Sequence, residues 1–286
     1  MAIVLEGSSE MITEQINVSD RFQMQPKRET ILGIKVSTLN MLMALEQLDQ
    51  WVTARTQNYV CVAPAHSIMD GFNQPDLKRI LNGSGMTTPD GMAVVWLLKL
   101  KGHRHVQRVY GPDLLLATCE HGLIKGYRHY FYGGAPGVVH KLVEKICARY
   151  PGLQVAGTMM HPFHSVSVEE DAKIIDQINA AHADIVWVGL GSPKQEIWMH
   201  EHLGRLNSPV MVGVGAAFDF LSGNKPQAPL WMQRSGLEWL FRFGNEPKRL
   251  WPRYRQYPKF LLLAVLELLG LIKTQTKPGQ GELSNL

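Results

Sequence analysis

Short apolar runs that alternate with helical segments constrain the fold of this chain more than any other feature. Five such runs lie at residues 59–63, 129–132, 154–158, 184–188 and 210–212, and four of them are directly next to a Gly or Pro. Several are almost continuously apolar, which is typical of strands that are buried on both faces. Segments with apolar residues at helical spacing separate them. This alternation predicts an α/β fold, with a mostly parallel, Rossmann-like sheet and helices on both faces.

The remaining segments divide the chain into three parts. Residues 1–28 are polar, lack periodicity and are predicted to form a flexible tail. A short strand at 31–36 is predicted to begin an α/β core that covers 29–245. Residues 246–286 are predicted to form a helical, basic and apolar appendage near a membrane, followed by a disordered tail. Contents of 45% hydrophobic and 19% charged residues are ordinary for a folded protein of 286 residues.

The composition argues against several functional classes. A formal charge of +4 is too small to indicate a nucleic-acid partner. The three cysteines lack metal-ligand spacing and are typical of reduced thiols in a cytoplasmic protein. No secretory signal is expected, and no apolar run reaches the roughly 20 residues that span a bilayer. Without an Asp-x-Asp pair or a His or Cys cluster, no metal site is expected.

Asp90 lies between Pro89 and Gly91, just before an apolar run at residues 92–98 with helical spacing. Because Pro and Gly bracket it, we expect this carboxylate in a tight turn at or near a helix N-terminus. One interpretation is that Asp90 caps the helix. The other is that the carboxylate stands at the mouth of a pocket as a general base.

Three glycine-rich turns follow predicted strands, at residues 133–137, 189–196 and 213–219. The carboxyl ends of parallel strands share one edge of the sheet, where α/β proteins bind ligands, so these turns should lie beside the Asp90 turn. Glycines allow backbone N–H groups to approach an anion at a helix N-terminus. Gln195 offers a donor and acceptors for a sugar or nucleobase, and the aspartate that ends the third turn can accept from a ribose or uracil. Plain tight turns and helix caps are the alternative.

Tryptophans and arginines alternate between residues 230 and 257, and an almost wholly apolar run follows at 260–272. The segment has three interpretations: a buried helix with surface arginines, a nucleic-acid-binding segment, or a membrane-surface anchor. About 13 apolar residues are too few to span a bilayer, and flanking Arg, Lys and Trp are typical of membrane interfaces. The pattern therefore favours the anchor.

Six short stretches, each weak alone, carry a family resemblance when they are taken in order. They are Thr88-Pro89-Asp90-Gly91, Arg108-Val109-Tyr110-Gly111-Pro112-Asp113, Gly191-Ser192-Pro193-Lys194-Gln195-Glu196, Gly213-Val214-Gly215-Ala216-Ala217-Phe218-Asp219, Leu237-Glu238-Trp239-Leu240 and Glu246-Pro247-Lys248-Arg249-Leu250-Trp251. From about residue 31 to 269 the chain resembles the WecG/TagA/CpsF family of bacterial glycosyltransferases. The resemblance implies inverting, metal-independent transfer of a hexose-type sugar from a UDP-sugar to a polyprenyl-pyrophosphate-linked acceptor, in cell-surface or exopolysaccharide synthesis. It implies no cofactor.

The resemblance also implies roles for individual residues. Asp90 matches the general base of the family. Arg242 and Arg249 match arginines of a C-terminal appendage that closes over the site and holds pyrophosphate. Arg253 stands in for a third family arginine, which would fall at Pro252. The positions that match the substrate pocket are Ala63, Ala65, His66, Arg108, Gly191, Lys194, Gln195, Gly215 and Asp219.

One departure from the family leaves the donor sugar open. Ala63-Pro64-Ala65 stands where the family often has Thr-Pro-Asn. The expected partners are a UDP-sugar, a lipid-linked glycan acceptor and the membrane surface, and no nucleic acid; a homo-oligomer is left open. The resemblance places the protein on the cytoplasmic face of the inner membrane as a peripheral protein.

Two other functions compete with this interpretation. An NAD-dependent nucleotide-sugar epimerase or dehydrogenase is also an α/β protein, but it needs a dinucleotide fingerprint near the first strand and an acidic residue about 20 positions later. The sequence has neither. The other competitor is a non-catalytic, membrane-associated scaffold in which the glycine loops are only turns.

Overall fold

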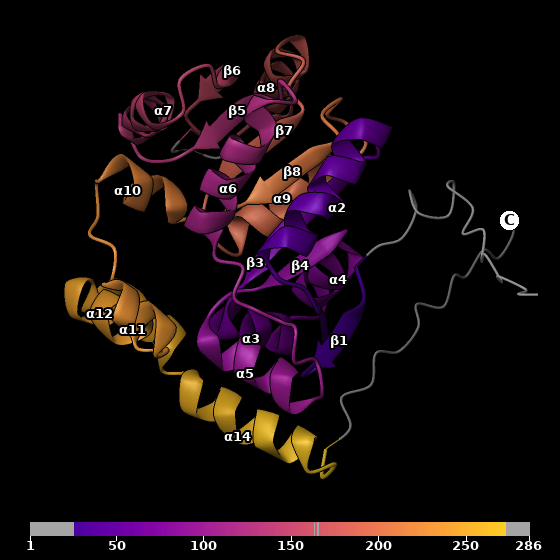
Figure 1. Ribbon diagram of the computed structural model, residues 1–286, viewed down its shortest axis with the longest axis vertical. Coiled ribbons are helices and arrows are strands. Elements are labelled where there is room, and N and C mark those ends of the chain that lie inside the picture. The colour runs from indigo at the N-terminus through magenta and orange to yellow at the C-terminus, as the bar shows by residue number, and fades with distance from the viewer. Residues whose placement is uncertain (1–25, 163, 165, 273–286) are drawn as a thin grey trace, which may run out of the picture.

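A computed structural model describes residues 26–162, 164 and 166–272. Its centre is a six-stranded, all-parallel sheet with the strand order β4-β3-β8-β7-β5-β6 (Figure 1). The predicted α/β class is confirmed. Both predicted tails lie mostly outside the described residues. The strands are β3 (Asn58–Ala63), β4 (Met86–Pro89), β5 (Arg128–Gly133), β6 (Gln154–Met159), β7 (Ile185–Gly189) and β8 (Val210–Gly213).

Helices cover both faces of this sheet, as predicted. One buried apolar cluster joins the sheet to α3, α4, α5, α8 and α9, and a second joins it to α2, α6, α7 and α10. The helices are α2 (Met41–Ala54), α3 (Ala65–Asn73), α4 (Pro75–Gly83), α5 (Met92–Leu100), α6 (Gly111–Leu123), α7 (Val138–Arg149), α8 (Val168–Ala180), α9 (Lys194–His202) and α10 (Ala217–Ser222).

The prediction of a single strand at 31–36 is wrong. The structure has an antiparallel hairpin of β1 (Arg28–Ile31) and β2 (Ile34–Ser37), separate from the parallel sheet. Leu32 and Gly33 form its turn with φ values of 49° and 81°. A left-handed backbone of this kind interrupts a strand, and glycine adopts it without a steric penalty. The apolar pattern concealed the turn because Leu32 is itself buried.

β4 is an edge strand that the sequence pattern did not indicate. It pairs in parallel with β3 so that Pro89 lies beside Ala63. Asp90 leaves the sheet directly after this strand, and α5 then begins with Gly91 as its N-cap. The helix-cap interpretation of Asp90 is therefore wrong. The carboxylate lies one residue before the cap, where it faces other strand ends.

Four further helices follow the sheet: α11 (Leu230–Arg234), α12 (Glu238–Asn245), α13 (Pro247–Tyr254) and α14 (Tyr257–Leu268). α14 lies beside α3 (Figure 1) and buries Phe260 and Ala264 there. Its Glu267 carboxylate accepts from the backbone N–H of Leu32 at 3.1 Å and pairs with Lys101 at 3.8 Å. The predicted boundary after residue 245 falls between α12 and α13, which pack against each other. Across the described part of the chain, no helix combines the length and apolarity needed to cross a membrane.

Candidate active site

The carboxyl ends of the parallel strands bring the predicted loops to one rim. The register pairs Gly133 with Gly189 and Val188 with Gly213, so the three glycine-rich turns leave the sheet next to one another. A small cavity beside Asp90 is lined by residues of the second and third turns. A larger one beside it is lined by all three. The predicted convergence of these loops is confirmed.

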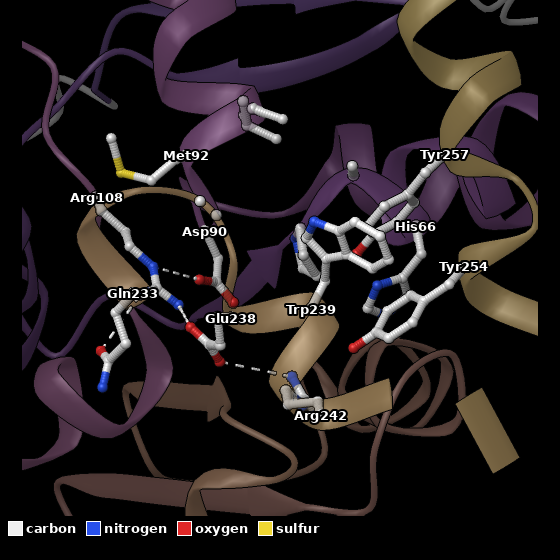
Figure 2. A pocket seen from close by; sticks show the side chains of 16 residues that line it. His66, Asp90, Met92, Arg108, Gln233, Glu238, Trp239, Arg242, Tyr254 and Tyr257 are labelled. Atoms are coloured by element: carbon white, nitrogen blue, oxygen red, sulfur yellow. Dashed lines mark hydrogen bonds and ion pairs between the residues drawn. The ribbon is translucent and has the colours of Figure 1, made fainter. Parts of the chain in front are cut away.

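Asp90 lies on this rim directly after the edge strand β4, with its side chain 13% exposed (Figure 2). Its Oδ1 atom accepts a hydrogen bond from Nε of Arg108 at 3.1 Å. Burial raises the pKa of Asp90, and the carboxylate of Glu238 adds to this effect, whereas the Arg108 guanidinium opposes it. Two cavities meet at this carboxylate, one toward the glycine turns and one toward α12. Asp90 is therefore held by one cation and open to both cavities.

Arg108 connects the strand ends to the C-terminal helices. Its Nη2 atom donates to Glu238 at the start of α12, and its Nη1 atom donates to Gln233 of α11 at 3.4 Å. The guanidinium lies 3.9 Å from the centre of the Tyr110 ring. Although burial opposes it, the carboxylates of Asp90 and Glu238 raise the pKa of Arg108. The guanidinium thus forms ion pairs with two carboxylates, Asp90 and Glu238.

Glu238 is a site residue to which the sequence analysis gave no role. Besides Arg108, it accepts a hydrogen bond from the Tyr110 hydroxyl at 3.0 Å and lies 3.9 Å from Arg242. Trp239, Tyr254 and Tyr257 from the same C-terminal helices line the Asp90 cavity, and Figure 2 shows them grouped around His66. The Leu237–Leu240 stretch of the family resemblance was the signal that could have identified Glu238.

His66, in the first turn of α3, lines both cavities beside Asp90. The residue is only 7% exposed, and its Nδ1 atom has no hydrogen-bond partner among the described residues. Burial, together with the cations Arg253 and Arg242, lowers the pKa of His66 to about 3. The imidazole is therefore neutral at physiological pH and has a free ring nitrogen. The two alanines that replace polar residues of the family differ in position. Ala65 lines the Asp90 cavity, whereas Ala63 is fully buried in β3 and lines none of the described cavities.

Gln195 fixes the glycine turn after β7. Its Oε1 atom accepts from the backbone N–H of Gly191 at 3.2 Å, and its Nε2 atom donates to the buried Glu196 at 3.1 Å. A Cβ atom at Gly215 would lie 3.1 Å from Gln195 Oε1, so the third turn also packs closely on this amide. Lys194 is exposed and lines the larger cavity. Gln195 consequently orders the loop as well as lining the cavity beside Asp90.

Asp219 lies in the larger cavity, which has a volume of about 770 Å³. The carboxylate accepts from Asn224 at 2.8 Å and pairs with Lys225 at 3.3 Å. Arg249 lines the same cavity and pairs with Glu246, which also contacts Lys225 at 2.9 Å. The hydrogen bond from Arg249 is the main reason that the pKa of Glu246 falls to about 2.

The three arginines assigned to pyrophosphate are divided between the cavities. Arg242 lines both cavities at Asp90, and Arg253 lines the one toward the glycine turns, where it donates to the carbonyl oxygen of Ser192 at 2.8 Å. Arg249 lies in the larger cavity instead. Residues 26–162, 164 and 166–272 contain no group of three or more His, Cys, Asp or Glu side chains that could hold a metal ion.

Comparison with known proteins identifies the family. The model of the glycosyl transferase WecG/TagA/CpsF family matches residues 29–274. The chain belongs to this family. It is 29% identical over 240 residues to an N-acetylglucosaminyldiphosphoundecaprenol N-acetyl-beta-D-mannosaminyltransferase of Bacillus subtilis strain 168. The matched region covers 84% of this chain and 91% of the relative. It is 32% identical over 192 residues to the enzyme of the same name from Bacillus spizizenii strain W23, covering 67% and 72%.

The protein is therefore a glycosyltransferase, and the predicted family and enzyme class are confirmed. Within this glycosyltransferase, the cavities bring together most of the residues that the resemblance singled out. Asp90, His66, Gln195, Arg242 and Arg253 share the cavity toward the glycine turns. The larger cavity holds Lys194, Asp219 and Arg249, and the two cavities share Gly191 and Gly215.

Proposed function

We propose that this glycosyltransferase moves a hexose-type sugar from a UDP-sugar to a polyprenyl-pyrophosphate-linked acceptor, with inversion at the anomeric carbon. One observation carries the proposal. The Asp90 carboxylate opens into two cavities that also contain Arg242, so a base and a cation face the same space. An inverting transfer needs this pair: a base for the acceptor hydroxyl and positive charge for the departing diphosphate.

The larger cavity suits the nucleotide half of the donor. Its volume of about 770 Å³ lies within the usual range of about 300–1,000 Å³ for small-molecule sites. It includes Lys194 at the N-terminus of the nine-residue helix α9, where backbone N–H groups favour an anion. Asp219 supplies an acceptor for ribose hydroxyls or the uracil N–H. Glycines 191 and 215 connect this cavity to the one at Asp90, so the sugar would extend toward the base.

Asp90 is suited to general-base catalysis because burial raises its pKa toward the operating pH. The base removes the proton from the acceptor hydroxyl as its oxygen attacks the anomeric carbon. The bond from that carbon to the diphosphate oxygen breaks, and the departing UDP takes the electron pair. Arg242 and Arg253 supply charge-assisted hydrogen bonds to the diphosphate, the role that a divalent cation has in other transferases.

The acceptor assignment is supported by the two Bacillus relatives, whose names specify a diphosphoundecaprenol-linked N-acetylglucosamine. The C-terminal helices support contact with a membrane surface, because large apolar side chains are exposed there. Those more than half exposed on α11, α13 and α14 are Leu230, Trp231, Trp251, Leu261 and Leu262. We therefore propose a peripheral enzyme on the cytoplasmic face of the inner membrane.

The decisive experiment tests Asp90→Asn with a panel of UDP-sugars and a synthetic polyprenyl-diphosphate-linked sugar, with products read by mass. The wild type should form product from at least one UDP-hexose or UDP-N-acetylhexosamine. The variant should keep the unfolding midpoint within a few degrees and lose about 100- to 10,000-fold in kcat. Near-normal turnover by the variant would remove Asp90 from the mechanism. Bound NAD in the purified protein would favour the epimerase alternative, and no UDP release from any donor would favour the scaffold.

Membrane contact is tested by sedimentation with vesicles of phosphatidylethanolamine and phosphatidylglycerol. A double substitution of Trp231 and Trp251 by serine should reduce the bound fraction several-fold, because these large apolar residues are 63% and 58% exposed. Ile124→Ser is the matched control, since Ile124 at the end of α6 is 97% exposed but lies outside the C-terminal helices. Equal losses in both proteins would contradict a docking surface on these helices.

A further inference from the structure

Two carboxylates from distant parts of the chain hold one guanidinium in the site. Arg108 donates through Nε to Asp90, which is 18 residues away, and through Nη2 to Glu238, which is 130 residues away. Figure 2 shows the Arg108 guanidinium linked to both carboxylates, with Arg242 on the other side of Glu238. Asp90 directly follows strand β4, and Glu238 is the first residue of α12. Within the described residues, the Asp90 side chain thus accepts its hydrogen bond from a cation that a C-terminal helix also holds.

Glu238 is built into this position. Its side chain is 12% exposed, and its Oε1 atom accepts from the Tyr110 hydroxyl at 3.0 Å while Oε2 contacts Arg108. Gln233 of α11 binds the same guanidinium through Oε1 and is itself held by a hydrogen bond from its Nε2 to the carbonyl of Ala228 at 2.8 Å. Buried charge-assisted bonds of this kind fix geometry, because removing one partner leaves the other charge uncompensated.

We propose that Glu238 is a positioning residue that divides Arg108 between itself and Asp90, so that the docked C-terminal helices keep Asp90 available as a base. The inference rests on the proposed function of Asp90. An arginine that faced a single carboxylate would hold it in a stronger ion pair and make it a weaker base. With Glu238 in place, the Nη2 edge of Arg108 is occupied, and Asp90 receives only the Nε–H group.

Other charged and titratable groups line the cavity at the same carboxylate. Arg242 lines the cavity beside Asp90 and opposes the effect of Glu238 on the pKa of Asp90. His66 is neutral, since burial and the neighbouring arginines lower its pKa to about 3. Burial raises the pKa of both Tyr254 and Tyr257, so they are neutral as well. Glu238 is therefore the group that counters the arginines at Asp90.

The test is the dependence of kcat/KM on pH for Glu238→Gln in the full-length protein. The acid limb of this profile reports the essential base of the free enzyme. Removing a unit charge that acts across a guanidinium, at an effective dielectric constant of about 20, should lower the limb by about one pH unit. The weaker base should also reduce kcat on the plateau by roughly threefold to tenfold. Arg108→Gln should move the limb in the opposite direction, to higher pH.

Glu267→Gln is the matched control. It removes another carboxylate that fastens the C-terminal helices to the core, through Leu32 and Lys101, but it lies outside the cavities at Asp90. A purely structural role of Glu238 would make the two variants alike, with activity lost evenly at every pH. Glu238→Asp, which keeps the charge, should restore the position of the limb even if its kcat is reduced.

An acid limb that stays in place in a folded Glu238→Gln protein would overturn the inference, as would identical profiles for Glu238→Gln and Glu267→Gln. Either result leaves the base assignment intact as long as Asp90→Asn abolishes transfer. If Asp90→Asn keeps its turnover, the proposed function of Asp90 is itself wrong. If Glu238→Gln does not fold, Glu238→Asp takes its place in the test. Because this variant keeps the charge, an acid limb that moves by as much as that of Arg108→Gln overturns the inference.

Discussion

His66 should make this protein sensitive to mild acid. The residue is 7% exposed, its Nδ1 atom lacks a partner within the described residues, and its pKa in the folded protein is about 3. In the unfolded chain a histidine has a pKa of about 6.5. As the pH falls below about 6.5, the unfolded chain takes up a proton that the folded protein refuses. The free energy of unfolding therefore decreases with falling pH, and this contribution ends only near the folded pKa.

The size of the effect follows from the two pKa values. Each pH unit over which one state binds a proton and the other does not changes the free energy of unfolding by about 1.4 kcal/mol. Between pH 7.5 and pH 5.0 the unfolded histidine becomes almost fully protonated, whereas His66 in the folded protein stays neutral. The resulting loss is about 2 kcal/mol, a large part of the roughly 5–15 kcal/mol that stabilises a typical domain.

Urea unfolding of the wild type and His66→Gln at pH 7.5 and 5.0 measures this contribution. The wild type should lose about 2 kcal/mol more than the variant between the two pH values. His129→Gln is a positive control, because burial lowers the pKa of His129 to about 4. Its replacement should reduce the acid-induced loss in the free energy of unfolding by a similar amount. A His66→Gln protein that loses as much stability as the wild type, beside a His129→Gln protein that does not, would refute the reasoning.

Two further perturbations follow from the rim. Gly133→Ala should cost about 2–5 kcal/mol in urea unfolding, because φ is 112° and the new Cβ would lie 2.9 Å from the Gly189 backbone. Gly137→Ala, at φ 74° with no heavy atom within 4 Å of the new Cβ, should cost only about 1–2 kcal/mol, and equal losses would contradict the packing argument. Arg253→Ala should lower kcat/KM at least about tenfold in the transfer assay, since it removes a charge-assisted bond to Ser192 beside the cavity; an unchanged kcat/KM would exclude this arginine from binding.

The sheet was predictable from local pattern, and its exceptions have physical causes. Strands such as β7 are buried on both faces, so their sequences are continuously apolar and can be recognised without neighbours. β4 has the sequence Met-Thr-Thr-Pro, and it is a strand only because β3 and the β1–β2 hairpin surround it. The turn at Leu32-Gly33 was hidden by the burial of Leu32. In both places tertiary contacts override the local signal.

The site divides in a similar way. Gln195 and Asp219 follow directly from the rule that the carboxyl ends of parallel strands share one edge, because the strands before them were recognised. Asp90 was expected at the same edge, although the strand before it was not recognised. Glu238 does not, because its partner Arg108 is 130 residues away and nothing near Glu238 in the sequence indicates an ion pair across that separation. Glu196 was missed for a different reason: it lies at an ordinary helical position, and only its complete burial beside Gln195 marks it.

The charge balance of the site connects these residues to the proposed chemistry. Among the described side chains that line the two cavities beside Asp90, three guanidinium groups meet two carboxylates, and His66 is neutral. The C-terminal helices bring Arg242 and Arg253 together with Glu238, so their docking adds one net positive charge to the pair that Asp90 and Arg108 already form. If the C-terminal helices contributed the arginines without Glu238, the site would bind a diphosphate more strongly. The arginines would then also pair more strongly with Asp90 and make it a weaker base. A carboxylate on Arg108 removes that conflict, because it reduces the positive charge at Asp90 while Arg242 and Arg253 stay available where the diphosphate departs.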